Sequence, residues 1–293
     1  AGCFLTAAPA AVLKRRRSSA HFPFRGWDYE LTRIGAFVPA AARPAEPPLV
    51  SIITRTYEGR DLFLRQAALS VAHQTYRPLE HIVVQDGGDS LRPQVEHISR
   101  STGLPITFLG RLRSGRSACG NAGLAAATGR WCMFLDDDDL LFADHLETLV
   151  NAVQAAPDAV AAYSTAWEVQ TEARGTPSGD YREVSYTVPD SLREDFNYQS
   201  LLHHNLMAIQ SVLFSRSLFL ERGGFDEQLD LLEDWDLWKR YAYRNRFVFV
   251  PKVTSLFRTP ADPTLRGSRE RAMAAAYPIA AARTDAWIND VSR

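Results

Sequence analysis

Residues 131–140 read WCMFLDDDDL and are the most informative ten residues of the chain. The apolar run 131–135 predicts a short buried strand. Four aspartates, Asp136 to Asp139, follow it without a break. Adjacent carboxylates repel one another unless solvent or a cation neutralises them, and hard divalent cations such as Mg²⁺ and Mn²⁺ prefer oxygen ligands. The sequence therefore indicates either a metal site or a solvated acidic turn at the end of a strand.

Predicted strands and helices alternate around this stretch. Short apolar runs predict strands at 49–54, 81–85, 106–109 and 131–135, and helices are predicted at about 62–71, 118–127 and 144–156. The alternation implies βαβ units, and hence an α/β fold with a single, mostly parallel central sheet and flanking helices. Ligands of such folds bind beyond the carboxyl ends of the strands, where the four aspartates would lie.

The second half of the chain is less regular. The predicted elements are strands at 160–167, 210–215 and 247–250, a polar loop at 171–180, a helix at 233–244 and a C-terminal helix at 266–283 interrupted by Pro278. Glu233 and Asp234 open the helix at 233–244, where the helix dipole favours carboxylates. Acids at a helix start are commonly structural only, but one of these two could also act as a general base.

Composition excludes several classes of protein. The 293 residues include 33 Lys+Arg and 34 Asp+Glu, so the net charge of −1 gives no global basic field for binding nucleic acid. No apolar run is long enough to predict a transmembrane segment. Cys3, Cys119 and Cys132 fit no zinc or disulfide pattern, which favours a reducing, cytoplasmic compartment.

Three segments are predicted along the chain. Residues 1–48 end in the proline-rich sequence VPAAARPAEPP and are expected to form an arm or linker, or the end of a preceding segment. Residues 49–258 form the main domain, and residues 259–293 form a C-terminal helical extension. Because the first residue is Ala1, the chain could be one domain of a longer polypeptide.

Several short motifs resemble those of the family 2 glycosyltransferases, which are inverting enzymes with the GT-A fold. In chain order these motifs are RTYE at 55–58, VVQDGG at 83–88, GNAG at 120–123, ATG at 127–129, FLDDDD at 134–139, GGFDE at 223–227 and EDWDLWKR at 233–240. Each motif is weak by itself, but their order and spacing hold from about Pro48 to Arg258. The resemblance implies a GT-A nucleotide-diphospho-sugar transferase fold for residues 49–258.

The resemblance also implies roles for single residues. The donor-binding residues it implies are Tyr57, Asp86, Arg116, Asp136, Asp137, Arg55 and Thr56. Among these, Asp86 would contact the nucleotide base, Tyr57 would line the base pocket, and Arg116 would reach toward the diphosphate. Asp138 matches the direct ligand of Mn²⁺ or Mg²⁺, with Asp136 as the second carboxylate of the metal motif.

Asp234 matches the catalytic base of the family. The acceptor-binding residues expected beside it are Glu233, Trp235 and His204, with His203 and Asn205 as further candidates. Trp235 could stack on a sugar ring or pack in the core, and the two histidines could equally be surface or packing residues.

The chain departs from the family pattern around the donor. Arg55 replaces the usual proline, Glu58 the usual asparagine, Gln85 the first aspartate of a pair, and Gly120 the arginine that many members carry. Some relatives place a downstream histidine on the metal, and this chain has none there. Arg258 or Arg266 could contact the diphosphate instead.

The function implied by the resemblance is inverting, metal-dependent transfer of a sugar from a nucleotide-diphosphate donor to a hydroxyl of a glycan or lipid-linked glycan. The expected setting is bacterial surface polysaccharide assembly in the cytoplasm or at the inner face of the membrane, with peripheral contact at most. Two alternatives remain open. One is an inactive GT-A-like domain that binds nucleotide sugars or glycans. The other is a sugar-phosphate nucleotidyltransferase, although residues 53–57 lack the glycine-rich loop of that class.

Overall fold

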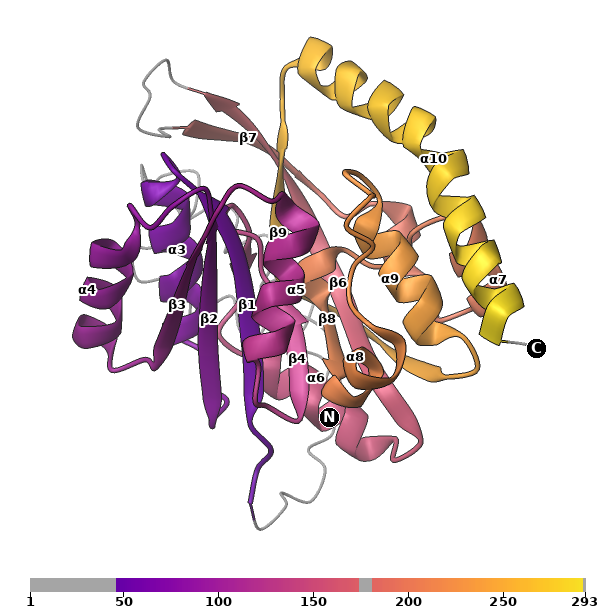
Figure 1. Ribbon diagram of the computed structural model, residues 1–293, viewed down its shortest axis with the longest axis horizontal. Coiled ribbons are helices and arrows are strands. Elements are labelled where there is room, and N and C mark those ends of the chain that lie inside the picture. Colours follow the sequence, from indigo (N-terminus) through magenta and orange to yellow (C-terminus); the bar gives the residue numbers. More distant parts are fainter. Residues whose placement is uncertain (1–45, 174–180, 292–293) are drawn as a thin grey trace, which may run out of the picture.

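The computed structural model describes residues 46–173 and 181–291. These residues form a nine-stranded sheet in the order β3-β2-β1-β4-β8-β6-β9-β5, with β7 paired to β6 (Figure 1). Neighbouring residues of β1 pack on opposite faces of the sheet: Ile53 contributes to one apolar cluster and Ile52 to another. Both faces are therefore covered, as expected for an α/β fold.

The first half of the sheet is parallel, as predicted. Its elements are β1 (Val50–Tyr57), α3 (Asp61–Ala72), β2 (Leu79–Asp86), α4 (Arg92–Thr102), β3 (Ile106–Arg111), α5 (Arg116–Ala126) and β4 (Trp131–Phe134). The pairs β1–β2, β1–β4 and β2–β3 are all parallel. The helix α4 was not predicted, because only Val95 and Ile98 of its residues are buried and its apolar pattern is correspondingly short.

The second half is mixed. Its elements are β5 (Leu140–Leu141), α6 (His145–Ala155), β6 (Ala159–Ala173), β7 (Tyr181–Thr187), η1 (Asp190–Arg193), α7 (Tyr198–His203), η2 (Ile209–Ser211), β8 (Val212–Ser215), α8 (Arg216–Arg222), α9 (Glu233–Ala242), β9 (Arg246–Pro260) and α10 (Pro263–Val291). β8 is antiparallel to both β4 and β6, whereas β6 and β9 are parallel. The fold is thus an α/β fold whose parallel core carries a mixed extension.

Some predictions need correction, and others concern residues outside those that the structure describes. The strands predicted at 160–167 and 247–250 are each 15 residues long in the structure. The prediction was too short because the outer ends of both strands are partly exposed and lack an apolar pattern. The predicted loop 171–180 begins inside β6, and its residues 174–180 lie outside the described residues. Residues 1–45 of the predicted arm lie outside them as well.

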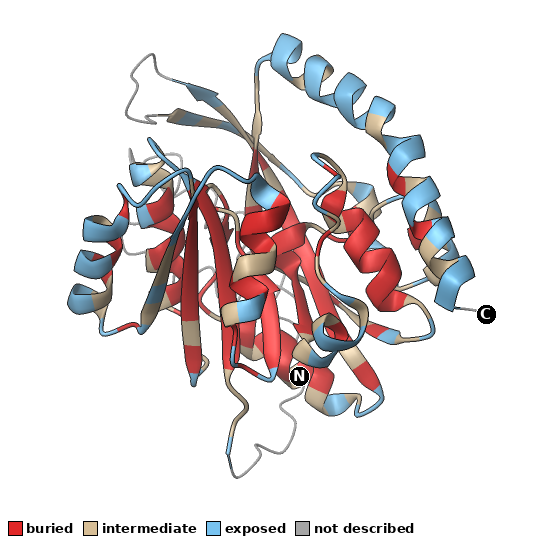
Figure 2. Cartoon of the chain, viewed as in Figure 1, coloured by how far each residue is buried: buried red, intermediate tan, exposed pale blue. Residues whose placement is uncertain are grey.

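The predicted interruption at Pro278 is wrong, since α10 runs through it from Pro263 to Val291. Figure 2 shows that most of this helix is exposed, so water can bind the carbonyl that loses its partner at the proline. The buried residues Ala280 and Thr284 hold the helix against the rest of the chain. Within residues 46–173 and 181–291, no helix combines the length and apolarity needed to cross a bilayer.

Strand register gathers the predicted site residues at one edge of the sheet. Tyr57 pairs with Asp86 at the end of β1 and β2, and Ile53 pairs with Phe134 at the end of β4. β1 continues beyond its last partner in β4, so Arg55 lies level with Asp136. Because the strands are parallel, all these carboxyl ends meet at the same edge.

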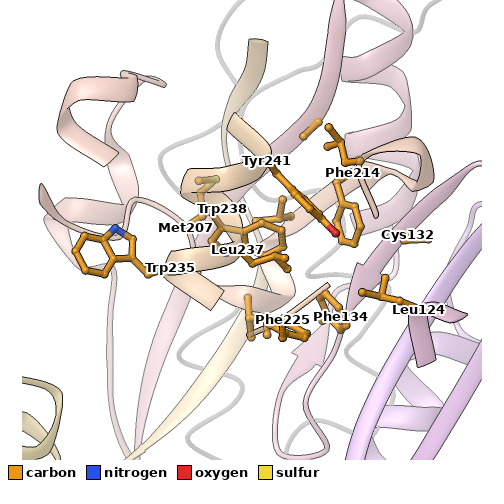
Figure 3. Packing of buried hydrophobic residues seen from close by; sticks show 14 of the residues in the cluster. Leu124, Cys132, Phe134, Met207, Phe214, Phe225, Trp235, Leu237, Trp238 and Tyr241 are labelled. Atoms are coloured by element: carbon orange, nitrogen blue, oxygen red, sulfur yellow. The ribbon is translucent and has the colours of Figure 1, made fainter. Parts of the chain in front are cut away.

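The larger apolar cluster holds α9 against the sheet (Figure 3). The rings of Phe134 and Phe225 lie 4.7 Å apart, and those of Phe214 and Trp238 lie 5.7 Å apart. Aromatic pairs at such distances contribute about 0.5–1.5 kcal/mol beyond their buried area. Since Phe134 ends β4 and Trp238 belongs to α9, this packing places the start of α9 beside the four aspartates.

Candidate active site

Arg55 links the two acidic regions of the chain. Its Nε and Nη2 donate to Oδ1 and Oδ2 of Asp136, each at 2.7 Å, and its Nη1 donates to Oε1 of Glu233 at 3.2 Å. The guanidinium lies over the rings of Phe225 and Phe134, at 5.2 and 5.9 Å. Burial alone would lower the pKa of Arg55, but Asp136 and Glu233 outweigh it and raise that pKa well above its ordinary value. Arg55 is therefore a permanent buried cation.

Arg116 closes a ring of four charged side chains with Arg55. Its Nη2 donates to Oδ2 of Asp136 at 3.0 Å, and its Nε lies 2.8 Å from Oε1 of Glu233. Burial would raise the pKa of Asp136, but the two arginines outweigh it and bring that pKa down to about 2. Asp136 is thus ionised at any ordinary pH. The ring joins side chains from β1, the end of β4, α5 and α9.

Asp234 lies next to this ring, and its pKa is shifted in the opposite direction to that of Asp136. Its Oδ2 accepts from Nδ2 of Asn205 at 3.0 Å, and its Oδ1 accepts from the backbone N–H of Trp235 at 2.8 Å. Burial, reinforced by the charge of Glu233, raises the pKa of Asp234 to about 6, although Arg116 opposes the rise. A carboxylate with a pKa close to neutral pH can accept a proton from a hydroxyl group and later release it.

Arg60 holds the middle of the aspartate run. Its Nη2 donates to Oδ1 of Asp137 at 2.8 Å and to Oδ2 of Asp138 at 2.6 Å, while Thr56 donates to Oδ2 of Asp137 at 2.7 Å. Burial raises the pKa of Asp137 to about 6 in spite of its hydrogen bonds to Arg60. The side chain of Asp138 is 38% exposed, more than that of any other aspartate in the run, and it pairs with Arg60.

Arg258 is buried and lies against the aspartate run. Its guanidinium donates to the backbone carbonyl of Asp138, to Oε1 of Gln66 at 3.0 Å and to the hydroxyl of Tyr181 at 2.6 Å. These bonds tie Arg258 to the aspartate run, and its contact with a diphosphate stays a prediction. The backbone N–H of Arg258 also donates to Asp139, whose pKa is raised well above its ordinary value by burial and by the neighbouring aspartates.

The predicted nucleotide-binding residues lie at the same edge of the sheet. Oδ1 of Asp86 accepts from the backbone N–H of Ser114 at 2.7 Å and of Gly115 at 3.3 Å, which fixes the loop that leads into α5. Tyr57 is exposed, and the guanidinium of Arg60 lies 5.3 Å from the centre of its ring. The structure therefore brings Tyr57 and Asp86 together, and their roles toward a nucleotide stay predictions.

On the predicted acceptor side, Trp235 belongs to the core. Its indole N–H donates to the carbonyl of Leu201 at 2.7 Å, its ring stacks on Tyr277 at 4.9 Å, and it is 1% exposed. A buried ring covered in this way cannot stack on a sugar, so packing is its role. His204 is exposed and lies 3.5 Å from Glu194, and its contact with an acceptor stays a prediction.

Sequence reasoning missed Arg60 and Tyr181. The sequence did contain a signal for Arg60. Arg60 follows the end of β1 by three residues, and β1 is parallel to β4, the strand that the aspartates follow. A cation at that point of the edge can reach those carboxylates. Tyr181 opens β7, and nothing local in the sequence indicates that this strand reaches Arg258 and Gln66.

Known proteins share both the sequence pattern and the fold. Residues 51–216 match the family described as Glycosyl transferase family 2. The uncharacterized glycosyltransferase RP339 of Rickettsia prowazekii is 28% identical over 220 residues, which cover 74% of this chain and 66% of that protein. The O-antigen biosynthesis protein RfbC of Myxococcus xanthus is 27% identical over 220 residues, which cover 73% of this chain and 16% of that protein. The chain thus spans less than two thirds of the length of both.

Two solved structures resemble the fold of this chain. TarS of S. aureus, in complex with UDP, aligns with a TM-score of 0.57 at 19% identity and covers 72% of this chain and 60% of its own. The mannosyltransferase PcManGT of Pyrobaculum calidifontis, in complex with GDP-Man and Mn²⁺, aligns with a TM-score of 0.59 at 20% identity and covers 91% of this chain and 69% of its own. These neighbours confirm the predicted GT-A fold. Since the family match extends over more than half of the residues, the chain belongs to glycosyl transferase family 2.

Proposed function

We propose that the chain transfers a sugar from a nucleotide-diphosphate donor to a hydroxyl group of a glycan or lipid-linked glycan, with inversion at the anomeric carbon. The observation that carries this proposal is the ion-pair ring, because it joins Asp136 of the aspartate run to Glu233, the neighbour of Asp234. A donor held at the aspartates would then lie beside a carboxylate whose pKa is raised to about 6, mainly by burial.

Asp138 is the residue we assign to a divalent cation. Within residues 46–173 and 181–291, no three His, Cys, Asp or Glu side chains are placed to hold a metal ion by themselves. Both carboxylate oxygens of Asp136 bond to Arg55, whereas Asp138 is partly exposed. One carboxylate combined with substrate phosphates is a common arrangement for Mg²⁺, so the residues fit a cation that binds together with the donor. When bound, Mn²⁺ or Mg²⁺ would neutralise charge on the departing diphosphate.

The remaining donor contacts follow from the edge of the sheet. Arg116 is 45% exposed and could turn from the ring toward the diphosphate, where a fork of N–H donors suits phosphate oxygens. Asp86 and Tyr57 would contact the base. TarS is seen with UDP and with UDP-GlcNAc, and PcManGT with GDP-Man, so the fold accommodates either nucleotide.

In the proposed step, the carboxylate of Asp234 takes the proton of the acceptor hydroxyl. The acceptor oxygen forms a bond to the anomeric carbon from the face opposite the leaving group. The bond between that carbon and the diphosphate oxygen breaks, its electron pair stays on that oxygen, and the nucleoside diphosphate departs. One displacement inverts the anomeric configuration. The Asn205 amide keeps the carboxylate oriented by donating to its second oxygen.

The setting we propose is assembly of a bacterial surface polysaccharide. Support comes from the relative RfbC, which is described as an O-antigen biosynthesis protein. The two cysteines in the described part of the chain, Cys119 and Cys132, are free and buried, in keeping with a cytoplasmic location.

The test is a screen of nucleotide sugars with and without Mn²⁺ for release of nucleoside diphosphate, followed by transfer to glycan acceptors. We expect one donor to be turned over, with product of inverted anomeric configuration by NMR. Binding of a nucleotide sugar with no release of nucleoside diphosphate under any condition would instead identify an inactive binding domain. Release of pyrophosphate from a nucleoside triphosphate and a sugar phosphate would identify a nucleotidyltransferase.

A further inference from the structure

Arg55 differs from Arg116 in how firmly it is held. The Arg55 side chain is 5% exposed and makes two bonds to Asp136 and one to Glu233, whereas the Arg116 side chain is 45% exposed. A two-pronged bond between guanidinium and carboxylate fixes both distance and orientation. Of the two cations in the ring, Arg55 is therefore the one built to stay in place.

The packing around Arg55 leaves it little freedom. A Cβ atom added at Gly120 of α5 would lie 3.5 Å from Cδ of Arg55 and 2.5 Å from the ring of Phe225. The guanidinium itself lies 5.2 Å from the centre of that ring. The absence of a side chain at position 120 therefore makes room for the ring of Phe225, and that ring and α5 both lie against the Arg55 side chain.

The start of α9 is strained and needs an external hold. Leu232, the residue before the helix, has φ of 61°, a left-handed conformation that is uncommon for a residue with a side chain. Such a conformation costs about 1–3 kcal/mol and persists where the surroundings enforce it. Glu233 follows Leu232 directly, and its buried carboxylate is bonded on both sides to arginine.

We propose that Arg55 is a positioning residue, which ties Glu233 to Asp136 and thereby places Asp234, one residue further along α9, against the donor. The effect of Arg55 on catalysis rests on the proposed function, because Asp234 must act as the base. The effect of Arg55 on the structure of the site does not rest on that function, since it concerns only how the first turn of α9 is held.

The charged groups around Asp234 make this role measurable. Glu233 on α9 raises the pKa of Asp234, whereas Arg116 on α5 and Arg55 on β1 lower it. The other groups facing its carboxylate, the Asn205 amide and the backbone N–H of Trp235, are neutral donors. Displacing the positive charge at position 55 away from Asp234 should therefore move the pKa of Asp234 upward, and neutralising Glu233 should move it downward.

The experiment compares Arg55→Lys and Glu233→Gln with the wild-type chain and with Arg246→Lys. Lysine keeps the charge but lacks the guanidinium group that bonds both Asp136 and Glu233. Glu233→Gln removes the ion pair between Arg55 and Glu233 while leaving the two bonds from Arg55 to Asp136 intact. Arg246 makes an exposed pair with Asp158 and is the matched control. We expect kcat to fall about 10- to 100-fold in both site variants, since small misplacements of a catalytic group cost that much. In Glu233→Gln the donor KM should stay within about threefold of wild type, because bonds that act through α9 affect the chemical step rather than donor binding.

The second readout does not depend on activity. The ¹³C-carboxyl signal of Asp234, identified by its loss in Asp234→Asn, should titrate at higher pH in Arg55→Lys and at lower pH in Glu233→Gln. Should Arg55→Lys fail to fold, kcat and the donor KM of Glu233→Gln still decide the question, because they report on the position of Asp234 and not only on the charge beside it. A purely structural role predicts lower melting temperatures with unchanged kcat in both variants and an unchanged titration of Asp234 in Arg55→Lys, and that result would overturn the proposal.

The two proposals fail in different ways. If the wild-type chain transfers no sugar, the proposed function is wrong, and the titration of Asp234 in the variants still tests whether Arg55 controls this site. If the wild-type chain is active and the variants behave like Arg246→Lys in both readouts, the proposed function stands and the role of Arg55 is wrong.

Discussion

Individual aspartates of this site ionise very differently although they are close in space. The pKa of Asp136 is brought down to about 2 because two arginines outweigh its burial, whereas burial and Glu233 raise that of Asp234 to about 6. In the function we propose, groups of one chemical type would thereby acquire separate tasks: a fixed negative charge beside the donor and a proton acceptor near it.

Replacing Asp234 by Asn should abolish transfer while leaving donor binding intact. General base catalysis contributes about 10²- to 10⁴-fold, so kcat should fall by that factor. In the wild-type chain, kcat should decline as the pH falls through about 6, the pKa to which burial raises Asp234. Steady-state kinetics from pH 5 to 8 and donor titration calorimetry check both statements. Near-normal turnover of Asp234→Asn would exclude it as the base.

The same substitution should stabilise the fold at neutral pH. Burial raises the pKa of Asp234 to about 6, above the value of 3.8 for an unburied aspartate, so the folded chain binds more protons than the unfolded chain between these values. Stability therefore falls as the pH rises through this window, by on the order of 1–3 kcal/mol. Asn carries no such penalty. Thermal unfolding should show a higher melting temperature for Asp234→Asn at pH 8 and little difference at pH 4.

Replacing Asp138 by Asn should remove metal-dependent donor binding. Asp138 is the partly exposed aspartate of the run, and a neutral amide is a poorer ligand for Mn²⁺ than a carboxylate. Calorimetry with a nucleoside diphosphate should show Mn²⁺ strengthening binding to the wild-type chain but not to the variant. Asp158→Asn, at an exposed aspartate remote from the aspartate run, is the control. Equal enhancement in all three proteins would contradict the assignment.

At the scale of elements, α5 is positioned by glycines. A Cβ atom at Gly123 would lie 2.3 Å from Cγ2 of Ile53 in β1, and one at Gly224 would lie 2.1 Å from Oδ1 of Asn121. α5 thus lies closer to β1 and to Gly224 than it could if position 123 or position 224 carried a side chain. This close approach brings Arg116, the first residue of α5, to the ring of charges.

Gly123→Ala should therefore destabilise the chain. The added methyl group collides with a buried β-branched side chain that has little freedom to move, and such overpacking costs about 1–3 kcal/mol. Gly267→Ala is the matched control, because its Cβ meets only the flexible end of Arg271 at 3.4 Å and alanine favours helix. Urea unfolding should show a loss for the first variant and no loss for the second.

At the scale of the molecule, one apolar cluster joins the parallel half of the sheet to the mixed half. Its members include Ile53 and Phe134 from the first half, and Phe214 and Trp238 from the second. The ring of Phe214 contacts Phe134 at 5.8 Å and Tyr241 of α9 at 5.4 Å (Figure 3). Since neither half has a separate core on this face, we expect them to unfold together.

Phe214→Ala should lower the free energy of unfolding by about 3–5 kcal/mol without splitting the transition. Leu220→Ala, at a residue of α8 that is 64% exposed, should change it by less than about 0.5 kcal/mol. Circular dichroism in the far and near ultraviolet should give coincident melting curves for wild type and variants. Two separate transitions would show that the halves are independent units.

Much of this architecture could be predicted from local pattern. The runs 49–54 and 81–85 are short, apolar and β-branched, and they appear as parallel strands β1 and β2. The position of the aspartates followed from strand direction alone. Elements with exposed stretches were not predicted well: α4 was missed, and β6 and β9 were predicted too short, because their exposed residues carry no periodic signal.

By itself the sequence determined the family, through the order of its motifs. It also determined the α/β class and the edge of the sheet at which the acids gather, since strand periodicity and chain direction are local properties. Tertiary structure alone decided which charge meets which. Arg55 and Glu233 are 178 residues apart and bond only because β1 and α9 pack at one edge. Trp235 is adjacent to the predicted base in sequence, yet it is turned into the core by its bond to Leu201. Side-chain partners depend on packing between distant elements, which no local pattern encodes.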